Sequence, residues 1–292
     1  MSRESSWDWA EGDEIAPGRT VVGGLGGGSR YEVALVWDDD RFALFVAKVL
    51  RPHVVADEDA RRDLALEAEA LAALSHPVIL RGFDAVLDGP RPHLLVEHLE
   101  GPPLRRLLKK EPTLPLLQLV PLGLHVAAGL AYMARAGWVH LDIKPDNLIM
   151  GVPPRIIDLS IARTVERAAR TRGVIGTDAY MAPEQCGTPP WEGRIGPATD
   201  VFGLCATLWR AATGETPYPR GRGEAPEERF PQLSAPLAEP PRDMPSELAA
   251  LLRAGLARDP ADRPAARDLA TGFEPLLAAL PRRAPRGRGR RG

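Results

Sequence analysis

The sequence has few cysteines and no long hydrophobic run. Its only cysteines, Cys186 and Cys205, are too few for a disulfide framework or a thiolate metal site. No stretch approaches the roughly 18 uninterrupted apolar residues of a membrane-spanning helix. The first residues, MSRESSWDWAEGDE, are polar and acidic, unlike a signal peptide. These absences argue against a secreted or membrane-spanning protein, and the sequence predicts a cytoplasmic location.

The chain is long and apolar enough to bury a core. Hydrophobic residues make up 44% of its 292 residues, which excludes a wholly disordered chain and allows one large domain or two small ones. The formal net charge of −2 conceals an asymmetry, because the run at residues 281–292, PRRAPRGRGRRG, has six arginines and no acid. Such a run can contact phosphates of nucleic acid or anionic lipid, but the preferred interpretation is a solvated, disordered tail.

The first part of the chain, after a lead-in at residues 1–19, has mainly strand patterns. The strand-like runs are separated by Gly-rich and Asp-rich turns, which predicts an antiparallel sheet. One helix is predicted at residues 57–75, because strong helix formers follow an acidic start and His76 and Pro77 end the pattern. The expected strands cover residues 20–25, 31–37, 42–50, 79–88 and 92–99.

The second part of the chain has mainly helical patterns. Apolar residues recur at helical spacing over residues 117–134, with an interruption at Pro121 and Gly137 closing the segment. Helical patterns broken by Pro-rich loops follow, and no internal repeat is present. The sequence therefore predicts an α+β fold with a small β-rich lobe at about residues 20–98, containing one main helix, and a larger, mostly helical lobe at about 102–280.

A Gly-rich stretch lies between the first two expected strands. In GGLGGGSRYEV, Gly26 and Gly28 lack the Cβ that would keep a backbone amide away from a phosphate oxygen. Taken alone, the stretch is more typical of an ordinary tight turn than of a nucleotide site. Its significance depends on the residues that follow.

Charged and amide side chains follow the glycines at defined intervals. Lys48 ends a strand and Glu67 lies in the predicted helix, where the carboxylate can hold the ammonium near nucleotide phosphates. In HLDIKPDN, Asp142 and Asn147 are five residues apart, and Asp158 follows in IIDLS. Phosphoryl transfer requires an acceptor for a hydroxyl proton and oxygen ligands for Mg²⁺, and these three side chains can supply them.

The order and spacing of these motifs, which continue to MAPE at Glu184, resemble the eukaryotic-like serine/threonine protein kinases of bacteria. The resemblance covers residues 20–280. It implies a bilobal protein-kinase-like fold with ATP between the lobes. The implied reaction transfers the γ-phosphoryl group of ATP, with Mg²⁺ as cofactor, to Ser or Thr hydroxyls of protein substrates. Autophosphorylation is also expected, and no oligomeric state is indicated.

The resemblance assigns a role to each matching residue. Asp142 would be the catalytic base, Val96 the gatekeeper beside the adenine, and the backbone of Glu97 and Leu99 would hydrogen-bond to the adenine ring. The implied catalytic residues are Asp142, Lys144, Lys48, Glu67, Asn147 and Asp158, the last two of these binding Mg²⁺. The implied ATP-binding residues are Leu25, Gly26, Gly28, Val33, Val46, Lys48, Val96, Glu97 and Leu99. Three supporting contacts are also implied: Thr177 with Asp142 and Lys144, Asp200 with the catalytic loop, and Arg263 with Glu184.

Four positions depart from the family pattern. The third glycine of the loop is replaced by Tyr31, so phosphate cover is expected to be looser, or the neighbouring Arg30 supplies charge. Val46 adds bulk beside the adenine. In place of D-F-G the chain has Asp158, Leu159 and Ser160, and the lost glycine is expected to reduce the tendency of Asp158 to turn out of the site.

The fourth departure is Leu141, which stands where the motif H-R-D has arginine. In the family, that arginine typically meets a phosphate on the activation segment. We therefore expect activity without activation-segment phosphorylation, although Thr164 and Thr171 remain candidate acceptors. A pseudokinase that acts as an ATP-binding scaffold is the alternative. A small-molecule kinase is disfavoured by GTDAYMAPEQ, which forms a peptide-binding platform in the family.

Overall fold

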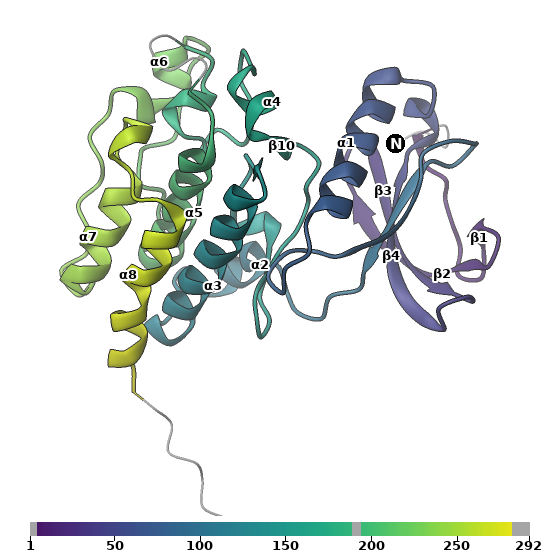
Figure 1. Cartoon of the computed structure of the whole chain (residues 1–292), viewed down its shortest axis with the longest axis horizontal. Helices are drawn as coiled ribbons and strands as arrows, with labels where there is room; N and C mark the ends of the chain where they lie inside the picture. Colours follow the sequence, from purple (N-terminus) through teal and green to yellow (C-terminus); the bar gives the residue numbers. More distant parts are fainter. Residues whose placement is uncertain (1–4, 189–193, 282–292) are drawn as a thin grey trace, which may run out of the picture.

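The chain folds into two lobes, one rich in β-strands and one mostly helical (Figure 1). The structure is a computed structural model that describes residues 5–188 and 194–281. The basic tail predicted at residues 281–292 lies outside the described residues from residue 282 onward. The lobes follow one another along the sequence, as the change of pattern predicts.

The β-rich lobe contains the predicted antiparallel sheet. Its six strands lie in the order β1-β2-β3-β4-β6-β5, and every neighbouring pair is antiparallel. The first strand belongs to the stretch that the sequence suggested as a lead-in. The strands are β1 (Glu14–Ala16), β2 (Arg19–Gly27), β3 (Tyr31–Asp38), β4 (Ala43–Leu50), β5 (Gly82–Val86) and β6 (His93–Glu97).

The register of the sheet separates its residues into two faces. Val33 pairs with Lys48, and Val46 pairs with Val96. Because paired residues share a face and alternate residues of a strand do so as well, these four side chains lie on one face of the sheet. The opposite face holds a separate apolar cluster with Trp7 packed against it. Its buried members are Ile15, Val21, Ala34, Val36, Phe45, Ala47, Val49 and Leu95.

Helix α1 (Glu58–Ala73) is the one long helix of the β-rich lobe. Asp57 caps it by accepting hydrogen bonds from the backbone amides of Asp59 and Ala60. Its buried residues include Leu64 and Leu71, at the spacing of one helix face. Glu67 lies on the same face and is almost fully buried, at 1% exposure. A buried carboxylate requires a partner, so the helix positions Glu67 for an ion pair.

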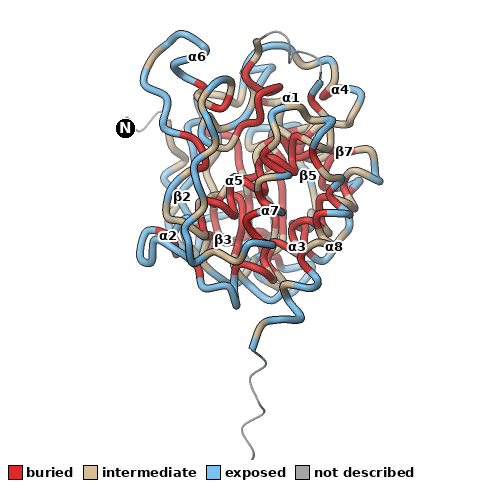
Figure 2. Tube along the Cα trace, turned by 90° about the vertical axis from the view of Figure 1, so that its left-hand side faces the viewer, coloured by how far each residue is buried: buried red, intermediate tan, exposed pale blue. Residues whose placement is uncertain are grey.

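The helical lobe is built around two helices, α3 and α5. Most of α5 is buried, and α3 packs against α5 and α8 (Figure 2). The helices are α2 (Leu104–Lys110), α3 (Leu116–Arg135), α4 (Val165–Ala169), α5 (Pro197–Thr213), α6 (Pro226–Arg229), α7 (Ser246–Gly255) and α8 (Ala266–Ala279). Short strands join them: β7 (Trp138–Val139), β8 (Leu148–Ile149), β9 (Arg155–Ile156) and β10 (Arg163–Thr164).

Helix α3 departs from its sequence pattern in one respect. The expected interruption at Pro121 is wrong, because the helix is continuous through it. Leu119, Val120 and Leu122 around the proline are buried, and this packing outweighs the missing backbone hydrogen bond. Among the described residues, α3 alone is long and apolar enough to cross a membrane, but half of its apolar stretch is buried inside the lobe. It is the core helix of this domain.

Candidate active site

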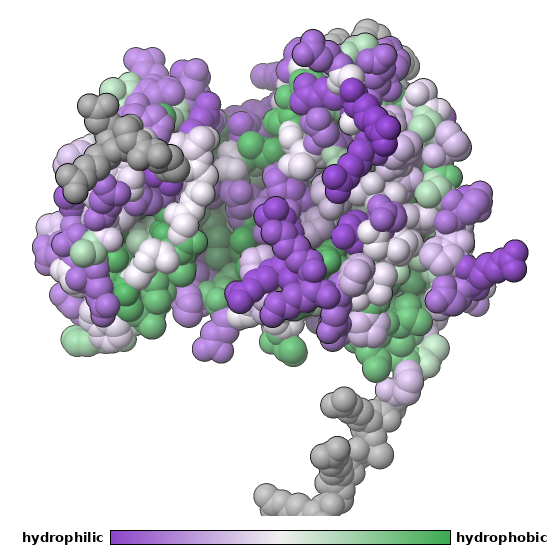
Figure 3. Space-filling view, turned by 180° about the vertical axis from the view of Figure 1, so that it is seen from behind, coloured by the Kyte–Doolittle hydropathy of each residue, from purple (hydrophilic) through white to green (hydrophobic). Residues whose placement is uncertain are grey.

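The candidate site lies at the hollow between the two lobes, where hydrophobic side chains border the opening (Figure 3). A loop between β7 and β8 carries Asp142 and Asn147, and Asp158 follows β9. β8 pairs with β9, and the amide of Ile157 donates to the carbonyl of Asn147 at 2.9 Å. This hairpin brings Asn147 and Asp158 together although eleven positions separate them in the sequence.

Lys48 joins the sheet, helix α1 and the segment after β9. Its Nζ lies 2.7 Å from Glu67 Oε2 and 2.9 Å from Asp158 Oδ1. Burial lowers the pKa of Lys48, but the charges of Glu67 and Asp158 outweigh burial and raise it. Burial raises the pKa of Asp158, but the charge and hydrogen bond of Lys48 outweigh it and bring the pKa to about 2. Asp158 is therefore ionised at neutral pH, as a cation ligand must be.

Asp142 is held by three side chains. Lys144 Nζ donates to Asp142 Oδ2 at 2.7 Å, and the Thr177 hydroxyl donates to Oδ1 at 2.7 Å. Lys144 also donates to Thr177 Oγ1, so the three side chains form a closed set. Asn147 Nδ2 donates to the carbonyl oxygen and to Oδ2 of Asp142. The contact expected between Thr177 and the pair Asp142–Lys144 is present, and it fixes the orientation of the carboxylate.

Asp200, near the start of α5, anchors the loop that carries Asp142. Its two carboxylate oxygens accept the backbone amides of His140 and Leu141, each at 2.7 Å. Leu141 has a φ of +70°, and Asp158 has a φ of +64°, which non-glycine residues rarely adopt. Buried hydrogen bonds offset the strain at Leu141, since its carbonyl also accepts from Gln185 Nε2 at 2.8 Å. The expected Asp200 contact is therefore present, and it stabilises a strained turn.

Arg263 and Glu184 form a fully buried ion pair, as expected. Arg263 Nη1 lies 2.7 Å from Glu184 Oε1, and both side chains are 0% exposed. The neighbouring Gln185 was not identified from the sequence, yet its Nε2 donates to the carbonyls of Leu141 and Ile175. The only sequence signal for it was its position directly after MAPE. The pair and the glutamine join the end of the activation segment to the catalytic loop.

The residues implied to bind ATP belong to strands β2, β3, β4 and β6, to the turn after β2 and to the segment after β6. Val33, Val46 and Val96 share the Lys48 face of the sheet. Leu25 lies in the exposed end of β2 and is 53% exposed. Gly26 and Gly28 have open space at the position of a Cβ, so backbone can approach a ligand there. Glu97 and Leu99 are half-buried and belong to the segment that connects the lobes.

Comparison with known proteins places the chain in a family. The protein kinase domain family matches residues 19–272. The chain belongs to the protein kinase family. Three bacterial proteins are similar to it. The serine/threonine-protein kinase PkaA of Streptomyces coelicolor is 33% identical over 80% of this chain. The probable serine/threonine-protein kinase PkwA of Thermomonospora curvata is 32% identical over 77% of this chain, and the serine/threonine-protein kinase PknL of Mycobacterium tuberculosis is 32% identical over 74%. The matched regions cover 43%, 30% and 54% of these relatives, respectively.

The activation segment of this kinase domain, which runs from Asp158 to Glu184, packs against Leu141. The leucine is 3% exposed in an apolar cluster with Ala168 of α4, and Val165 and Ile175 pack against that cluster. Arg167 of α4 also forms an ion pair at 2.7 Å with Glu69 of α1. Apolar packing thus occupies the place where the family pattern has an arginine. These contacts hold the segment against the catalytic loop and helix α1.

The two candidate phosphorylation sites of the kinase domain have structural contacts. Thr164 caps α4, because its hydroxyl accepts the backbone amide of Arg167 at 3.3 Å. The hydroxyl of Thr171 donates to the carbonyl of Arg167 at 3.3 Å. Both threonines therefore stabilise the short helix in their unmodified form.

Two features of the Gly-rich loop were not revealed by the sequence: the requirement for glycine at Gly27 and the position of the Tyr31 ring. A Cβ on Gly27 would lie 2.3 Å from the carbonyl oxygen of Tyr31, and the φ of Gly27 is +142°, so this hairpin requires glycine there. The Nζ of Lys48 lies over the Tyr31 ring, 4.5 Å from its centroid. Arg30 binds Asp63 of α1 at 2.6 Å, so its charge is already paired outside the loop.

The buried hydroxyl of Tyr31 leads to a prediction. Burial raises its pKa to about 12, and no described residue hydrogen-bonds to it. Tyr31→Phe removes an unpaired buried polar group and keeps the ring beneath Lys48, so we expect a gain of about 1 kcal/mol in unfolding free energy. Chemical denaturation measures this gain. The KM for ATP should stay the same, and a marked rise would instead assign the hydroxyl to substrate binding.

The donor set fits Mg²⁺ bound together with nucleotide phosphates. Asp158 offers an ionised carboxylate, and the hydrogen bonds of Asn147 to Asp142 use its amide nitrogen, leaving the amide oxygen as a ligand. Within residues 5–188 and 194–281, no group of three or more His, Cys, Asp or Glu side chains is arranged to hold a metal alone. Mg²⁺ ordinarily takes one or two protein ligands and completes its shell with phosphate and water.

Proposed function

We propose that this chain is an active serine/threonine protein kinase that transfers the γ-phosphoryl group of ATP to protein hydroxyls. The observation that carries the proposal is the closed set of Asp142, Lys144 and Thr177, with Asn147 donating to the same carboxylate. This arrangement holds a carboxylate in a single orientation beside the hollow. A scaffold that only binds ATP would have no use for it.

Each side chain has a proposed task in the transfer. Asp142 accepts the proton of the attacking hydroxyl, and Lys144 stabilises negative charge next to it. Lys48, held by Glu67, positions the nucleotide phosphates. Asn147 and Asp158 would hold Mg²⁺, which when bound neutralises charge on the phosphates. The catalytic effect is mainly positioning and charge stabilisation.

The same chain is proposed to work without phosphorylation of its activation segment. The apolar cluster around Leu141 and the contact of Arg167 with Glu69 support this, because both order the segment in its unmodified form. Residue 141 is a leucine, so a phosphate on the segment has no arginine to bind at this position. The coupling of the segment to the catalytic loop that this arginine provides in the family is therefore absent from this sequence.

Thr171→Ala tests this part of the proposal. We expect the variant to keep at least about half of the wild-type kcat, since it loses only a hydrogen bond worth about 1 kcal/mol at the end of a short helix. Initial rates of labelled phosphate transfer measure it, with mass spectrometry reporting modification of Thr164 and Thr171 in both proteins. A collapse of activity to background in the variant would contradict a phosphate-independent kinase.

A pseudokinase scaffold is the alternative function, favoured by Tyr31, whose ring lies beneath Lys48 where the family has glycine. One experiment separates the two functions. The purified full chain is incubated with labelled ATP and Mg²⁺ and a generic protein substrate, and ATP binding is measured separately. Label transfer that depends on Asp142 supports the kinase. Binding of ATP without transfer supports the scaffold.

We further propose protein substrates with Ser or Thr acceptors, autophosphorylation and a cytoplasmic location. The names of the relatives support the acceptor type, and the composition supports the location. The matched regions make up only part of those relatives, so their further functions are not carried over to this chain.

A further inference from the structure

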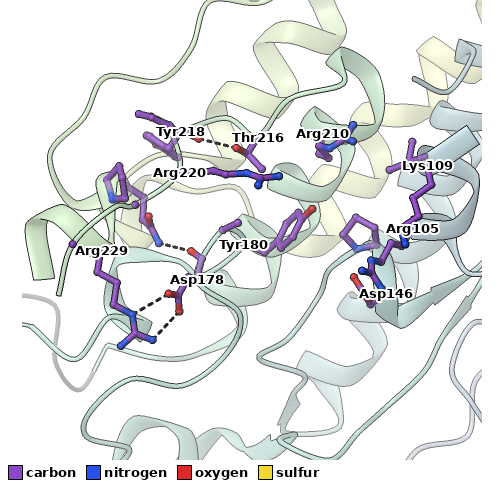
Figure 4. A pocket seen from close by; sticks show the side chains of 18 of the residues that line it. Arg105, Lys109, Asp146, Asp178, Tyr180, Arg210, Thr216, Tyr218, Arg220 and Arg229 are labelled. Carbon is purple, nitrogen blue, oxygen red and sulfur yellow. Dashed lines mark hydrogen bonds and ion pairs between the residues drawn. The ribbon is translucent and has the colours of Figure 1, made fainter. Parts of the chain in front are cut away.

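A large cavity of about 980 Å³ lies beside the catalytic loop, in the helical lobe (Figure 4). Its walls come from α2, the catalytic loop, the segment after Thr177, and the stretch from the end of α5 to α6. Asp146, four residues after Asp142, forms part of one wall, and Tyr180 lies near the centre of the view. The cavity is therefore separate from the nucleotide hollow but adjacent to the proposed catalytic base.

The lining of this cavity has an excess of positive charge. Arg105 is paired with Asp146 at 3.3 Å, and Arg229 is paired with Asp178 at 2.9 Å. Three further cations line the cavity: Lys109, Arg210 and Arg220. Among the described residues, none of the three has an acidic side chain within 4.0 Å. The one remaining acid in the lining is Glu224, which forms no ion pair with a described residue. The unpaired groups thus give the cavity a net positive charge.

The three unpaired cations border the same opening. Arg220 extends toward Tyr180, Arg210 lies at the upper edge, and Lys109 lies on the side opposite Arg229 (Figure 4). Burial raises the pKa of the Tyr180 hydroxyl, and the charges of Arg210 and Arg220 oppose that rise. An anionic group in this opening would meet several cations at once.

The position of the cavity determines which part of a substrate reaches it. Thr177 donates to Asp142 at 2.7 Å, and Asp178 and Tyr180, one and three residues after it, line the cavity. A polypeptide with its hydroxyl at Asp142 must continue past the site at about 3.3–3.6 Å per residue. Side chains a few positions from the acceptor can therefore reach the opening.

We propose that this cavity selects protein substrates that carry aspartate or glutamate a few residues from the acceptor Ser or Thr. The proposal rests on the proposed kinase function and adds the substrate class. Carboxylates form charge-assisted hydrogen bonds with arginine and lysine, and complementary charge across an interface sets partner preference. Basic sequences meet like charge in the same place and are disfavoured.

The activation segment itself is such a basic sequence. Arg170 and Arg172 flank Thr171, and Arg163 precedes Thr164. A cavity that repels arginine makes these threonines poor acceptors for a second copy of the kinase. The cavity therefore directs autophosphorylation to other sites.

The test uses paired peptides with one central serine. One peptide has two acidic residues on each side of the serine, and its partner has asparagine and glutamine at those positions. The wild-type chain should show a kcat/KM about tenfold higher for the acidic peptide at low salt, through a lower KM. The preference should shrink in about 1 M salt, where the Debye length falls to about 3 Å.

Matched double variants locate the effect in the cavity. Lys109→Gln with Arg220→Gln removes two cavity cations and should reduce the preference to about twofold or less. Lys110→Gln with Arg222→Gln removes the same charge from exposed neighbours outside this cavity and should leave the preference unchanged. Equal rates for both peptides in the wild type, or an equal preference in both double variants, would overturn the proposal.

A binding measurement keeps this test independent of catalysis. Fluorescence anisotropy compares the labelled acidic and amide peptides on the Asp142→Asn chain, with and without the cavity substitutions. Tighter binding of the acidic peptide that depends on Lys109 and Arg220 supports the cavity even if no phosphate is transferred. Equal binding of the two peptides rejects the cavity proposal even if a neutral peptide is phosphorylated by the wild-type chain.

Discussion

Asp142→Asn is expected to lower the kcat of phosphate transfer by roughly 10²–10⁴-fold, the range typical of a lost general base. Asparagine keeps the shape of the side chain but cannot take the proton of the attacking hydroxyl. It also removes the negative charge that receives hydrogen bonds from Lys144 and Thr177. Because Asp142 belongs to the loop between β7 and β8, whereas the valines implied to contact adenine belong to the sheet, the affinity for ATP should stay within about twofold.

Steady-state transfer of labelled phosphate measures the loss, and calorimetry measures ATP binding in the same preparations. Asp40→Asn is a matched control, because Asp40 is an exposed carboxylate in the turn between β3 and β4, outside the proposed site. Its kcat should equal that of the wild type. If Asp142→Asn transfers phosphate as fast as the wild type, another group must accept the proton and the assignment of the base is wrong.

Arg263→Met is expected to lower the unfolding free energy by about 3–5 kcal/mol, because it leaves a buried charge without its partner. Arg263 binds both oxygens of Glu184 and donates to the carbonyls of Ala198, Ala257 and Arg258. Lysine cannot reproduce this planar fork, so Arg263→Lys should also be strongly destabilising. Activity should fall as well, since Glu184 adjoins the Gln185 contacts to the catalytic loop.

Urea denaturation followed by circular dichroism measures the change. Arg253→Met provides the control, because Arg253 pairs with Glu239 on the surface of the same lobe, and exposed pairs contribute at most about 1 kcal/mol. Replacing both buried partners, with Arg263→Met and Glu184→Leu, should recover part of the lost stability. A loss below about 1 kcal/mol for Arg263→Met would contradict a structural role for the pair.

Several elements of the fold could be predicted because their signals are local. Strand-like runs indicated β3 and β4, and an acidic start followed by strong helix formers indicated α1. The error at Pro121 has a tertiary cause: residue preferences predict an interruption, but the buried neighbours of the proline in α3 stabilise a continuous helix.

The contacts of the site were predicted to different extents. The pairing of Lys48 with Glu67 followed from the family pattern, and the structure brings the two together at 2.7 Å. Tyr31 was identified as a departure, but its position beneath Lys48 depends on the hairpin geometry around Gly27. The missing arginine at Leu141 was evident, whereas the apolar cluster that occupies its place was not.

The sequence by itself determined the family resemblance, the order of the motifs and the types of residue available for phosphoryl transfer. These depend on spacing along the chain, and short spacings such as that from Asp142 to Asn147 survive in any fold that keeps the loop. Only the tertiary structure decided which distant side chains meet. The unpaired cations of the basic cavity come from α2, α5 and the stretch before α6, and Leu141 meets the activation segment through the packing of the helical lobe. Such contacts depend on strand register and on the packing of helices against one another, which spacing along the chain does not specify.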